Sequence, residues 1–384
     1  MTEITGEFGT AVVYADEVEE SAAEQIRFMM DQPMSAGANV KIMPDVHAGA
    51  GCVIGYTAKI TDQIVPNLVG VDIGCGVLAN QVEPSDRRFS ELHQSILESV
   101  PSGFAVRGKV IEYLPEAYER ITDGRSWEWF ERSTKEVCER MEQDQNRVWL
   151  SIGTLGGGNH FIEVNKDQDG KWWLVIHSGS RNFGLKIANY HQKIAQRMHP
   201  EVIKSIAFLT GDEASQYLHD MEVAQVYAKL NRFVMAWELL DHFFGLEDPS
   251  YSLNEVESVH NFIDMEDGII RKGAIRAYAG EPVVIPFNMA FGSVIGVGKS
   301  NEEWNYSASH GAGRVMGRKQ AKATLTLEDF KDSMRDVYSE TVTEGTLDEA
   351  PMAYKNPDVV LENIRESVEV THRLVPLFNF KAGA

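Results

Sequence analysis

A cysteine in a glycine-rich turn is the residue of this sequence with the clearest chemistry. Asp72 and Cys75 lie three residues apart in the segment GVDIGCG at 70–76. Glycine permits tight backbone geometry, so such a turn can direct a carboxylate and a thiol toward one point. Both groups are metal ligands, whereas the alternative is a buried cysteine with no ligand role, which is common in proteins. The neighbouring aspartate favours the metal site.

Three histidines supply the remaining ligand types. His160 follows a glycine triplet in GGGNHFIE at 156–163, a composition that suits a backbone cradle for phosphate but also an ordinary turn. His177 begins HSGSRNFG at 177–184, where hydroxyls, Arg181 and an expected helix N-terminus indicate an anion site; the alternative is a structural histidine at a strand end. His260 follows a short β-like run, and only the ligand types elsewhere give it weight.

Two further histidines stand beside groups that can assist them. Asp45 and His47, in PDVHAGAG at 44–51, fall on one side of an extended segment, where a carboxylate can orient an imidazole or share a metal. A capped turn with a surface histidine explains that segment equally well. His310, in SHGAGR at 309–314, has little side-chain cover and is followed by Arg314 and Arg318. An open imidazole beside cations can attack phosphorus, and the alternative is a solvated basic loop.

Taken together, these residue types predict a two-metal site with a phosphate pocket. Cysteine and histidine ligands put Zn²⁺ first. Mn²⁺ becomes plausible where carboxylate and phosphate oxygens complete the coordination shell.

Composition limits the classes of function. The chain has 384 residues, of which 43% are hydrophobic and 24% charged, which is enough for a large core. A formal net charge of -21 argues against a generally basic nucleic-acid coat protein, but it leaves room for an enzyme with a small basic site. Three cysteines form no disulfide framework, and the sequence shows neither a secretory pattern nor an apolar stretch near the ~20 residues of a membrane span. We therefore expect a cytoplasmic protein that does not contact a membrane.

Predicted helices and strands alternate without a strict βαβ order, which favours an α+β fold over a doubly wound sheet. Glycine motifs occur in both halves of the chain and no low-complexity linker separates them, so we expect one catalytic domain over 1–384. The longest helix is predicted over 212–244, where Pro and Gly are absent. The other predicted helices are 17–31, 85–98, 125–142, 184–198, 327–338 and 357–368. The predicted strands are Ala11–Tyr14, Val40–Met43, Val53–Ala58, Val77–Gln81, Val148–Ile152, Leu174–His177, Val283–Ile285, Val294–Val297 and Leu374–Phe380.

The motifs resemble those of the RtcB family of RNA-splicing ligases. The resemblance rests on MPDVHAGAG, VGVDIGCG, GGGNHFIE, HSGSRNFG and SHGAGR in this order, with AYK at 353–355, and it runs from about residue 40 to the C-terminus. It implies the family's α+β fold, with mixed sheets around a central metal-containing cleft. It also implies an enzyme that uses GTP and Mn²⁺ to join an RNA 3′-phosphate or 2′,3′-cyclic phosphate end to a 5′-hydroxyl end, in RNA repair or tRNA splicing. Whether an archease-type activator takes part is left open.

The same resemblance implies a role for each catalytic and metal-binding residue. A covalent guanylate is expected on His310, with Asp45 and His47 as the other catalytic residues. One Mn²⁺ would be held by Asp72, Cys75 and His160, and a second by Cys75, His177 and His260, with the thiolate bridging the two ions.

The resemblance also implies nucleotide contacts, and the basic residues themselves indicate RNA contacts. The nucleotide site would be formed by Asn159, Phe161, Glu163, Ser293, His310, Gly311, Ala312, Gly313, Tyr354 and Lys381. Arg181, Arg314 and Arg318 are the expected RNA contacts, because they lie beside phosphate-type motifs.

Other functions remain open from the sequence. A member of the family can act on a specialised damaged RNA, or mainly as a metal-dependent cyclic phosphodiesterase. The presence of His310 favours ligation, because hydrolysis needs no guanylate carrier. A catalytically silent RNA-binding protein belongs to a different class, and the complete set of ligand residues argues against it.

Overall fold

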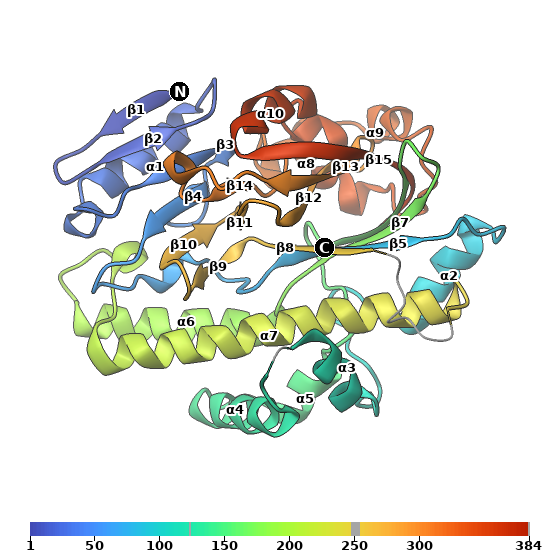
Figure 1. Ribbon diagram of the computed structural model, residues 1–384, viewed down its shortest axis with the longest axis horizontal. Helices are drawn as coiled ribbons and strands as arrows, with labels where there is room; N and C mark the ends of the chain where they lie inside the picture. Colours follow the sequence, from blue (N-terminus) through green and yellow to red (C-terminus); the bar gives the residue numbers. More distant parts are fainter. Residues whose placement is uncertain (123, 247–253, 383–384) are drawn as a thin grey trace.

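The computed structural model describes residues 1–122, 124–246 and 254–382 (Figure 1). One sheet has six strands in the order β1-β2-β3-β4-β10-β9. All its neighbours are antiparallel except β2 and β3, which run parallel. Its strands are β1 Thr2–Thr5, β2 Thr10–Val13, β3 Lys41–His47, β4 Ile54–Lys59, β9 Asn261–Asp264 and β10 Ile269–Lys272.

A second sheet carries most of the motifs. It has seven antiparallel strands in the order β12-β13-β15-β6-β7-β5-β8, and a separate pair joins β11 to β14. These strands are β5 Gly76–Val82, β6 Phe161–Lys166, β7 Trp172–Ser178, β8 Glu255–Val259, β11 Ala274–Arg276, β12 Pro282–Asn288, β13 Gly292–Gly298, β14 Ser307–Ser309 and β15 Val368–Lys381.

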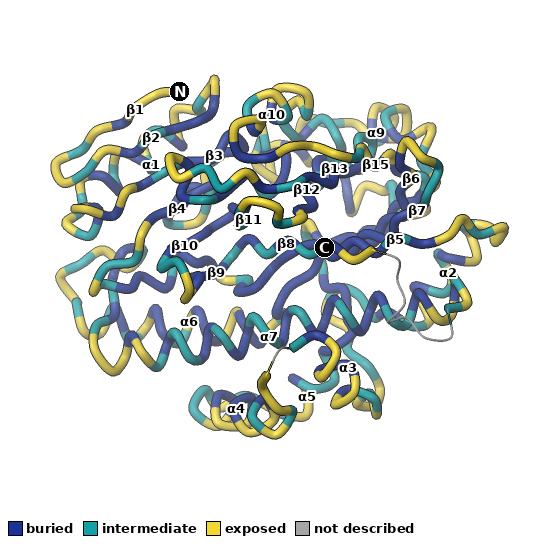
Figure 2. The backbone as a smooth tube through the Cα atoms, viewed as in Figure 1, coloured by how far each residue is buried: buried dark blue, intermediate teal, exposed yellow. Residues whose placement is uncertain are grey.

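A long helix, α7 (Gly211–His242), lies under both sheets beside α6 (Arg181–Met198), and α3–α5 pack against its far side (Figure 1). Because α7 is covered from several directions, its buried residues surround the helix and do not form a single stripe (Figure 2). The other helices are α1 Glu20–Met30, α2 Phe89–Ser99, α3 Leu114–Ile121, α4 Trp127–Arg140, α5 Gln145–Leu150, α8 Arg318–Thr324, α9 Leu327–Ser333 and α10 Pro357–Asn363. Short 3₁₀ helices occupy Pro33–Ser35, Pro66–Leu68, Lys204–Ile206, Glu302–Trp304, Glu344–Glu349, Pro351–Ala353 and Ile364–Glu366.

The largest hydrophobic core lies among the six-stranded sheet, α6, α7 and α4, with Ile42, Tyr56, Phe183, Tyr217 and Tyr227 almost fully buried. A second core packs the seven-stranded sheet on the C-terminal half of α7 and on α2. The central helix is thus shared by both sheets, and it fixes their relative position near the motifs.

The mixed arrangement confirms the predicted α+β class. One predicted element is wrong: Val148–Ile152 is not a strand, because Val148–Leu150 ends helix α5, which Asp144 caps by accepting a hydrogen bond from the Arg147 N–H. Two predicted helices end early. The helix predicted over 327–338 ends at Ser333, and the one predicted over 357–368 ends at Asn363, with β15 beginning at Val368. Among the described residues, no helix combines the length and the apolar character that a membrane crossing requires.

Candidate metal centre and active site

Strand order brings the predicted metal ligands together. The Asp72–Cys75 turn leads directly into β5, His160 immediately precedes β6, His177 is near the end of β7, and His260 directly follows β8. The register pairs Gly76 at the start of β5 with Ser178 on one side and with Val259 on the other. Phe161 pairs with His177 in the same way. Four adjacent strands therefore begin or end at the same end of the sheet, where these side chains converge.

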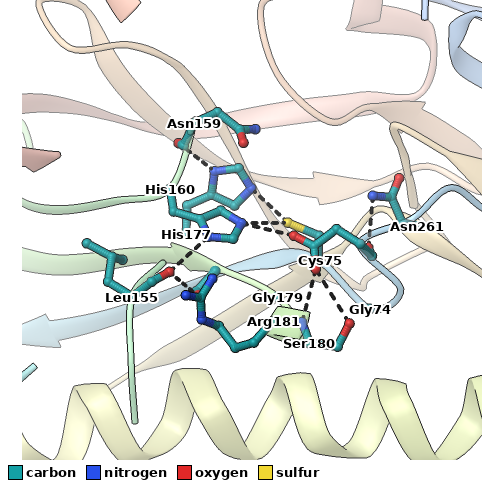
Figure 3. A network of polar contacts seen from close by, with 12 residues as sticks. Gly74, Cys75, Leu155, Asn159, His160, His177, Gly179, Ser180, Arg181 and Asn261 are labelled. Carbon is teal, nitrogen blue, oxygen red and sulfur yellow. Dashed lines mark hydrogen bonds and ion pairs between the residues drawn. The ribbon is translucent and has the colours of Figure 1, made fainter. Parts of the chain in front are cut away.

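The donor atoms lie close enough to share metal ions (Figure 3). Cys75 Sγ is 3.3 Å from His177 Nε2 and 3.5 Å from His160 Nε2. These three donor atoms all lie within 4.8 Å of one another, and their side chains are buried. Asp72 Oδ2 is 3.0 Å from His160 Nε2, and His260 Nε2 is 3.4 Å from His177 Nε2. All five predicted metal ligands are thus in one cluster.

Hydrogen bonds at the far side of the His160 and His177 rings show which nitrogen is available as a ligand. The Nδ1 of His160 is 2.8 Å from the Leu155 carbonyl, and the Nδ1 of His177 is 3.2 Å from the Asn159 carbonyl (Figure 3). A carbonyl oxygen only accepts, so both Nδ1 atoms must donate. In the neutral rings, Nε2 then carries a lone pair that faces the other ligands. Lone pairs that face one another at these distances are the arrangement a cation stabilises.

The electrostatics of the cluster fit the same conclusion. Burial alone would raise the pKa of Asp72, but hydrogen bonds with His160 and Cys75 and the nearby charges of His160 and Arg181 hold it below its usual value. Burial, together with the charge of Asp72, raises the pKa of the Cys75 thiol well above normal. Burial and neighbouring cations lower the pKa values of His177 and His260. A metal ion would compensate the buried thiolate, and neutral imidazoles are the form that binds metals.

Two polar residues of α7 hold the ligand-bearing loops in place. Asn231 is fully buried and accepts from the N–H groups of Gly153 and Thr154 while donating to the Thr154 and Gly179 carbonyls. Arg232, also fully buried, donates to the carbonyls of Gly74 and Ser178 at 2.8 Å each and pairs with Glu257. The sequence analysis missed both residues. The available signal was a polar pair in the middle of a long helix without Pro or Gly.

His310 is oriented by a buried carboxylate. Its Nδ1 lies 2.6 Å from Asp45 Oδ2, which also accepts from the N–H groups of His310 and Gly311 at 3.2 and 3.3 Å. Burial would raise the pKa of Asp45, but the His310 charge and hydrogen bond hold it below normal. The carboxylate therefore fixes Nδ1 as the donor, and Nε2 is the nitrogen left for chemistry. The centroid of the His310 ring lies 4.8 Å from that of the His260 ring, so His310 adjoins the candidate metal cluster.

His47 is the third residue predicted as catalytic, and it is held beside the same pair. Its Nδ1 is 2.9 Å from the Asp45 carbonyl, and burial lowers its pKa to about 4. Lys355 donates to the Pro44 and Val46 carbonyls and so fastens this part of β3. His47 is therefore uncharged at neutral pH.

A cavity of about 660 Å³ opens onto these groups. Its walls include Cys75, His177, His260 and His310. The predicted nucleotide contacts Asn159, Phe161, Glu163, Gly311, Ala312, Gly313, Tyr354 and Lys381 also line it. Ser293 is outside the lining: it lies on β13 next to Gly292, which does line the cavity, and its buried Oγ has no hydrogen-bond partner among the described residues.

One wall of the cavity, formed by Arg314, Arg318, Tyr354 and Lys381, carries a dense charge network around Glu349, which the sequence analysis missed. Glu349 is 2% exposed and contacts Lys381 Nζ at 2.6 Å, the Tyr354 hydroxyl at 2.7 Å, Arg314 at 3.3 Å and Arg318 more closely. Burial would raise its pKa, but Lys381 and Arg318 bring it down to about 2. Only its adjacency to the AYK motif, in DEAPMAYK at 348–355, hinted at a role.

This network has a surplus of positive charge. Asp348 pairs with Arg318 at 2.7 Å and with Lys322 at 3.3 Å, in addition to the contacts of Glu349. Four cations against two carboxylates leave a local excess of two positive charges. In a chain of net charge -21, this wall is suited to bind phosphate groups.

The three arginines predicted to contact RNA differ in how exposed their side chains are and in whether they line the cavity. Arg181 lies beside the metal cluster, donates to the Gly103 carbonyl and to Thr154 Oγ1, and does not line the cavity. Arg314 lines it but is 13% exposed in its side chain and is held by Glu349 and by the Asp348 carbonyl. Arg318 is 43% exposed, and it is the most accessible of the three.

Comparison with known proteins agrees with these observations. A sequence model of the family described as "tRNA-splicing ligase RtcB" matches residues 25–382. The protein named RNA-splicing ligase RtcB from Escherichia coli K12 is 33% identical over 362 residues, which cover 88% of each chain. Proteins named tRNA-splicing ligase RtcB from Archaeoglobus fulgidus and Aeropyrum pernix are 30% and 29% identical, over 94% and 92% of this chain and 91% and 90% of theirs. The chain belongs to the RtcB family.

Proposed function

We propose that this protein is an RNA ligase that joins an RNA 3′-phosphate or 2′,3′-cyclic phosphate end to a 5′-hydroxyl end at the expense of GTP, in RNA repair or tRNA splicing. The observation that carries the proposal is His310: its Nδ1 is held by Asp45, and it stands beside the metal cluster in a cavity with a basic wall. A nucleophilic imidazole, a metal cluster and a phosphate pocket together suit nucleotidyl transfer.

His310 would act as the nucleophile. The unprotonated Nε2 attacks the α-phosphorus of GTP, the bond to pyrophosphate breaks, and a guanylate remains on the ring. Water first opens a 2′,3′-cyclic end to a 3′-phosphate and a 2′-hydroxyl. An oxygen of the RNA 3′-phosphate then takes the guanylate, which frees His310. The 5′-hydroxyl attacks the activated phosphate and GMP leaves. Asp45 acts as the positioning group, because it keeps the proton on Nδ1 and stabilises positive charge on the ring.

The donor set fits two metal ions, which we propose to be Mn²⁺. Asp72, Cys75 and His160 would hold one ion, and Cys75, His177 and His260 the other, with the thiolate bridging. Such ions, when bound, offset phosphate charge and polarise phosphoryl oxygens. The chain's own contribution is orientation: Leu155 holds His160, Asn159 holds His177, and Arg232 of α7 holds the Asp72–Cys75 turn.

The basic wall and the polar lining would hold the nucleotide. Lys381, Tyr354 and Glu349 form one hydrogen-bonded group there. Asn159 and Phe161 lie directly beside Lys381, and with Glu163 they line the same cavity. We further propose that the chain acts as one catalytic domain over 1–384, that it works in the cytoplasm, and that RNA is its partner. The same assays, run with and without an archease-type protein, reveal any requirement for an activator.

Incubation with α-labelled GTP and Mn²⁺, followed by a denaturing gel and mass spectrometry, tests the proposal. We expect one GMP per chain on His310 in the wild type and none in His310→Ala, which retains its metals because His310 is outside the five-ligand cluster. Cys75→Ala is expected to lose both metals and all ligation, whereas Cys138→Ala, a buried cysteine outside that cluster, keeps both. GMP on a residue other than His310 would contradict the mechanism.

Addition of a labelled 3′-phosphate RNA and a 5′-hydroxyl RNA to the same reaction separates the alternatives. A ligase yields a joined product and releases GMP. A cyclic phosphodiesterase opens a 2′,3′-cyclic end without forming an adduct, and a silent RNA-binding protein does neither.

A further inference from the structure

One aromatic ring is almost fully exposed, on the turn whose Gly103 carbonyl accepts a hydrogen bond from Arg181. Phe104 is 94% exposed, the highest exposed fraction of any large apolar side chain in the described part of the chain. Single apolar residues are common on protein surfaces, so exposure by itself indicates no function. The exposure of Phe104 indicates a function only together with two further observations: where the residue lies and how its backbone is held.

Hydrogen bonds fix the loop that presents this ring. Gly103 N–H donates to the Gly156 carbonyl at 2.9 Å, and Ala105 N–H donates to the Ser102 carbonyl at 3.1 Å. The guanidinium groups of Arg181 and Arg147 donate to the carbonyls of Gly103 and Phe104, at 2.8 and 3.3 Å. Gly103 takes a φ of +62°, a conformation that favours glycine. The turn is therefore built to point Phe104 outward.

The same contacts tie the ring to the active site. Arg181, which holds the Gly103 carbonyl, lies beside Asp72, and its guanidinium fills the space that a side chain at position 156 would need. Gly156 begins the strip that ends at the predicted ligand His160, at most about 14 Å further along the chain. Gly158 of this strip approaches Arg318, whose Nη2 would lie 3.9 Å from a Cβ there. A strip poor in side chains thus links Phe104 to the basic wall.

We propose that Phe104 is a stacking platform for an unpaired base of the RNA substrate, close to the end that is joined. The proposal rests on the proposed ligase function. A strand whose reacting phosphate occupies the cavity can follow the glycine strip and reach Phe104. Stacking on an aromatic ring suits any base, because every base has a π-face, and it needs no net positive charge in a chain of -21. A single ring that a fixed turn presents to solvent offers one flat face of the size of a base.

Equilibrium binding of a single-stranded 3′-phosphate RNA tests the platform, with an abasic site placed at each of the last four nucleotides in turn. We expect one position at which the abasic site weakens binding to the wild type by roughly 5- to 100-fold. Phe104→Ala should lose a similar factor with the intact RNA, and the abasic site at that position should then cost nothing further, because the two changes remove one contact. Phe104→Trp should bind as the wild type does, and Phe104→Leu should resemble Phe104→Ala.

Phe8→Ala is the matched control, since Phe8 is 40% exposed on the N-terminal hairpin between β1 and β2. It should bind RNA as the wild type does, and thermal unfolding checks that Phe104→Ala is folded. Unchanged affinity in Phe104→Ala, an abasic penalty that persists in it, or full affinity in Phe104→Leu overturns the proposal, and the first result leaves a protein partner as the occupant. The adduct assay on the wild type is run in parallel: a missing adduct refutes the ligase function, while the binding comparison still decides on Phe104.

Discussion

A single buried carboxylate decides which nitrogen of His310 faces the cavity. Asp45 Oδ2 accepts three hydrogen bonds, one from His310 Nδ1 and two from the backbone N–H groups of His310 and Gly311. One oxygen atom therefore holds both the ring and its backbone. The pKa of Asp45 is held low, and the carboxylate therefore stays charged in the range where His310 must be unprotonated at Nε2. His47, neutral above about pH 4, adds no competing charge. In the proposed mechanism, the residues predicted as catalytic thus divide into one nucleophile, His310, and one positioning pair, Asp45 and His47.

Glu163 gives a pH-dependent prediction at the residue scale. Burial raises its pKa to about 7, against the opposing hydrogen bonds from the Asn165 and Asn379 amides. The folded protein therefore binds this proton more tightly than the unfolded chain, whose glutamate titrates near 4.5. The stabilisation is fully present below about pH 4.5 and is lost as the pH rises through about 7. Glu163→Gln cannot ionise and avoids that loss.

Urea unfolding of the nucleotide-free protein at several pH values measures this effect. The free energy of unfolding of Glu163→Gln, relative to the wild type, should rise between pH 5 and pH 8 by an amount on the order of 3 kcal/mol. Glu3→Gln, an exposed residue of β1, serves as the control and should show no such trend. A difference that stays flat with pH would mean that Glu163 is already ionised near pH 5.

At the scale of elements, α7 acts as the anchor of the metal centre. Asn231 and Arg232 bind backbone groups of the loops at 153–154 and 178–179 and of the Asp72–Cys75 turn. These segments come from three separate parts of the chain. The turn bears the predicted ligands Asp72 and Cys75, the loop at 178–179 follows His177, and the loop at 153–154 precedes Leu155, whose carbonyl binds His160. The long helix therefore sets the spacing of the ligands before any metal binds.

Gly74 is where the turn meets this anchor. It has a φ of +71°, and a Cβ there would lie 2.9 Å from the Gln225 backbone and 3.1 Å from the Ala228 side chain, both on α7. Gly74→Ala should destabilise the fold by about 1–3 kcal/mol and displace Cys75, so metal content should fall as well.

Gly37→Ala separates these effects. Gly37 has almost the same φ, +72°, but a Cβ there would have no neighbour within 4 Å. This variant should share the backbone strain and keep its metals. Denaturant unfolding and metal analysis of both variants provide the measurement, and equal metal content in the two would refute the anchoring role of the turn.

Local patterns located most of the elements near the site, and they failed where three-dimensional context decides. The absence of Pro and Gly marked α7 to within two residues of its end, because helix breakers act locally. Val148–Ile152 was wrong as a strand: its apolar residues pack in the core as part of α5, and short apolar runs have no distinctive period. Cys75 and the histidines at 160, 177 and 260 could be picked out as candidate metal ligands, because cysteine and histidine are rare residues and most of these lie in or beside glycine-rich motifs. Asn231, Arg232 and Glu349 were not, since their roles depend on partners distant in sequence.

At the scale of the whole molecule, the negative net charge of the protein opposes binding of the proposed RNA substrate, which is also negatively charged. The chain carries a net charge of -21, so RNA approaches a repulsive surface and must bind through a small basic area. The wall around Asp348 and Glu349 provides that area, with its local excess of two positive charges. We therefore expect modest affinity with a small number of phosphate contacts, and a correspondingly shallow dependence on salt.

Arg318 gives the sharpest form of this prediction. Glu349 holds both Arg314 and Arg318, but the Arg318 side chain is 43% exposed at the cavity, whereas that of Arg314 is 13% exposed. Each phosphate contact to a single strand changes the slope of log affinity against log salt by about 0.7. Arg318→Ala should flatten the slope by about that amount for every RNA sequence tested, since phosphate contacts do not read bases. Arg132→Ala removes an equally charged group that is 70% exposed on α4, distant from the cavity lining, and should leave the slope unchanged. Titrations between 50 and 200 mM salt with both variants decide the matter: if the two slopes change alike, the molecule's net charge alone governs RNA binding, and if neither changes, Arg318 makes no phosphate contact.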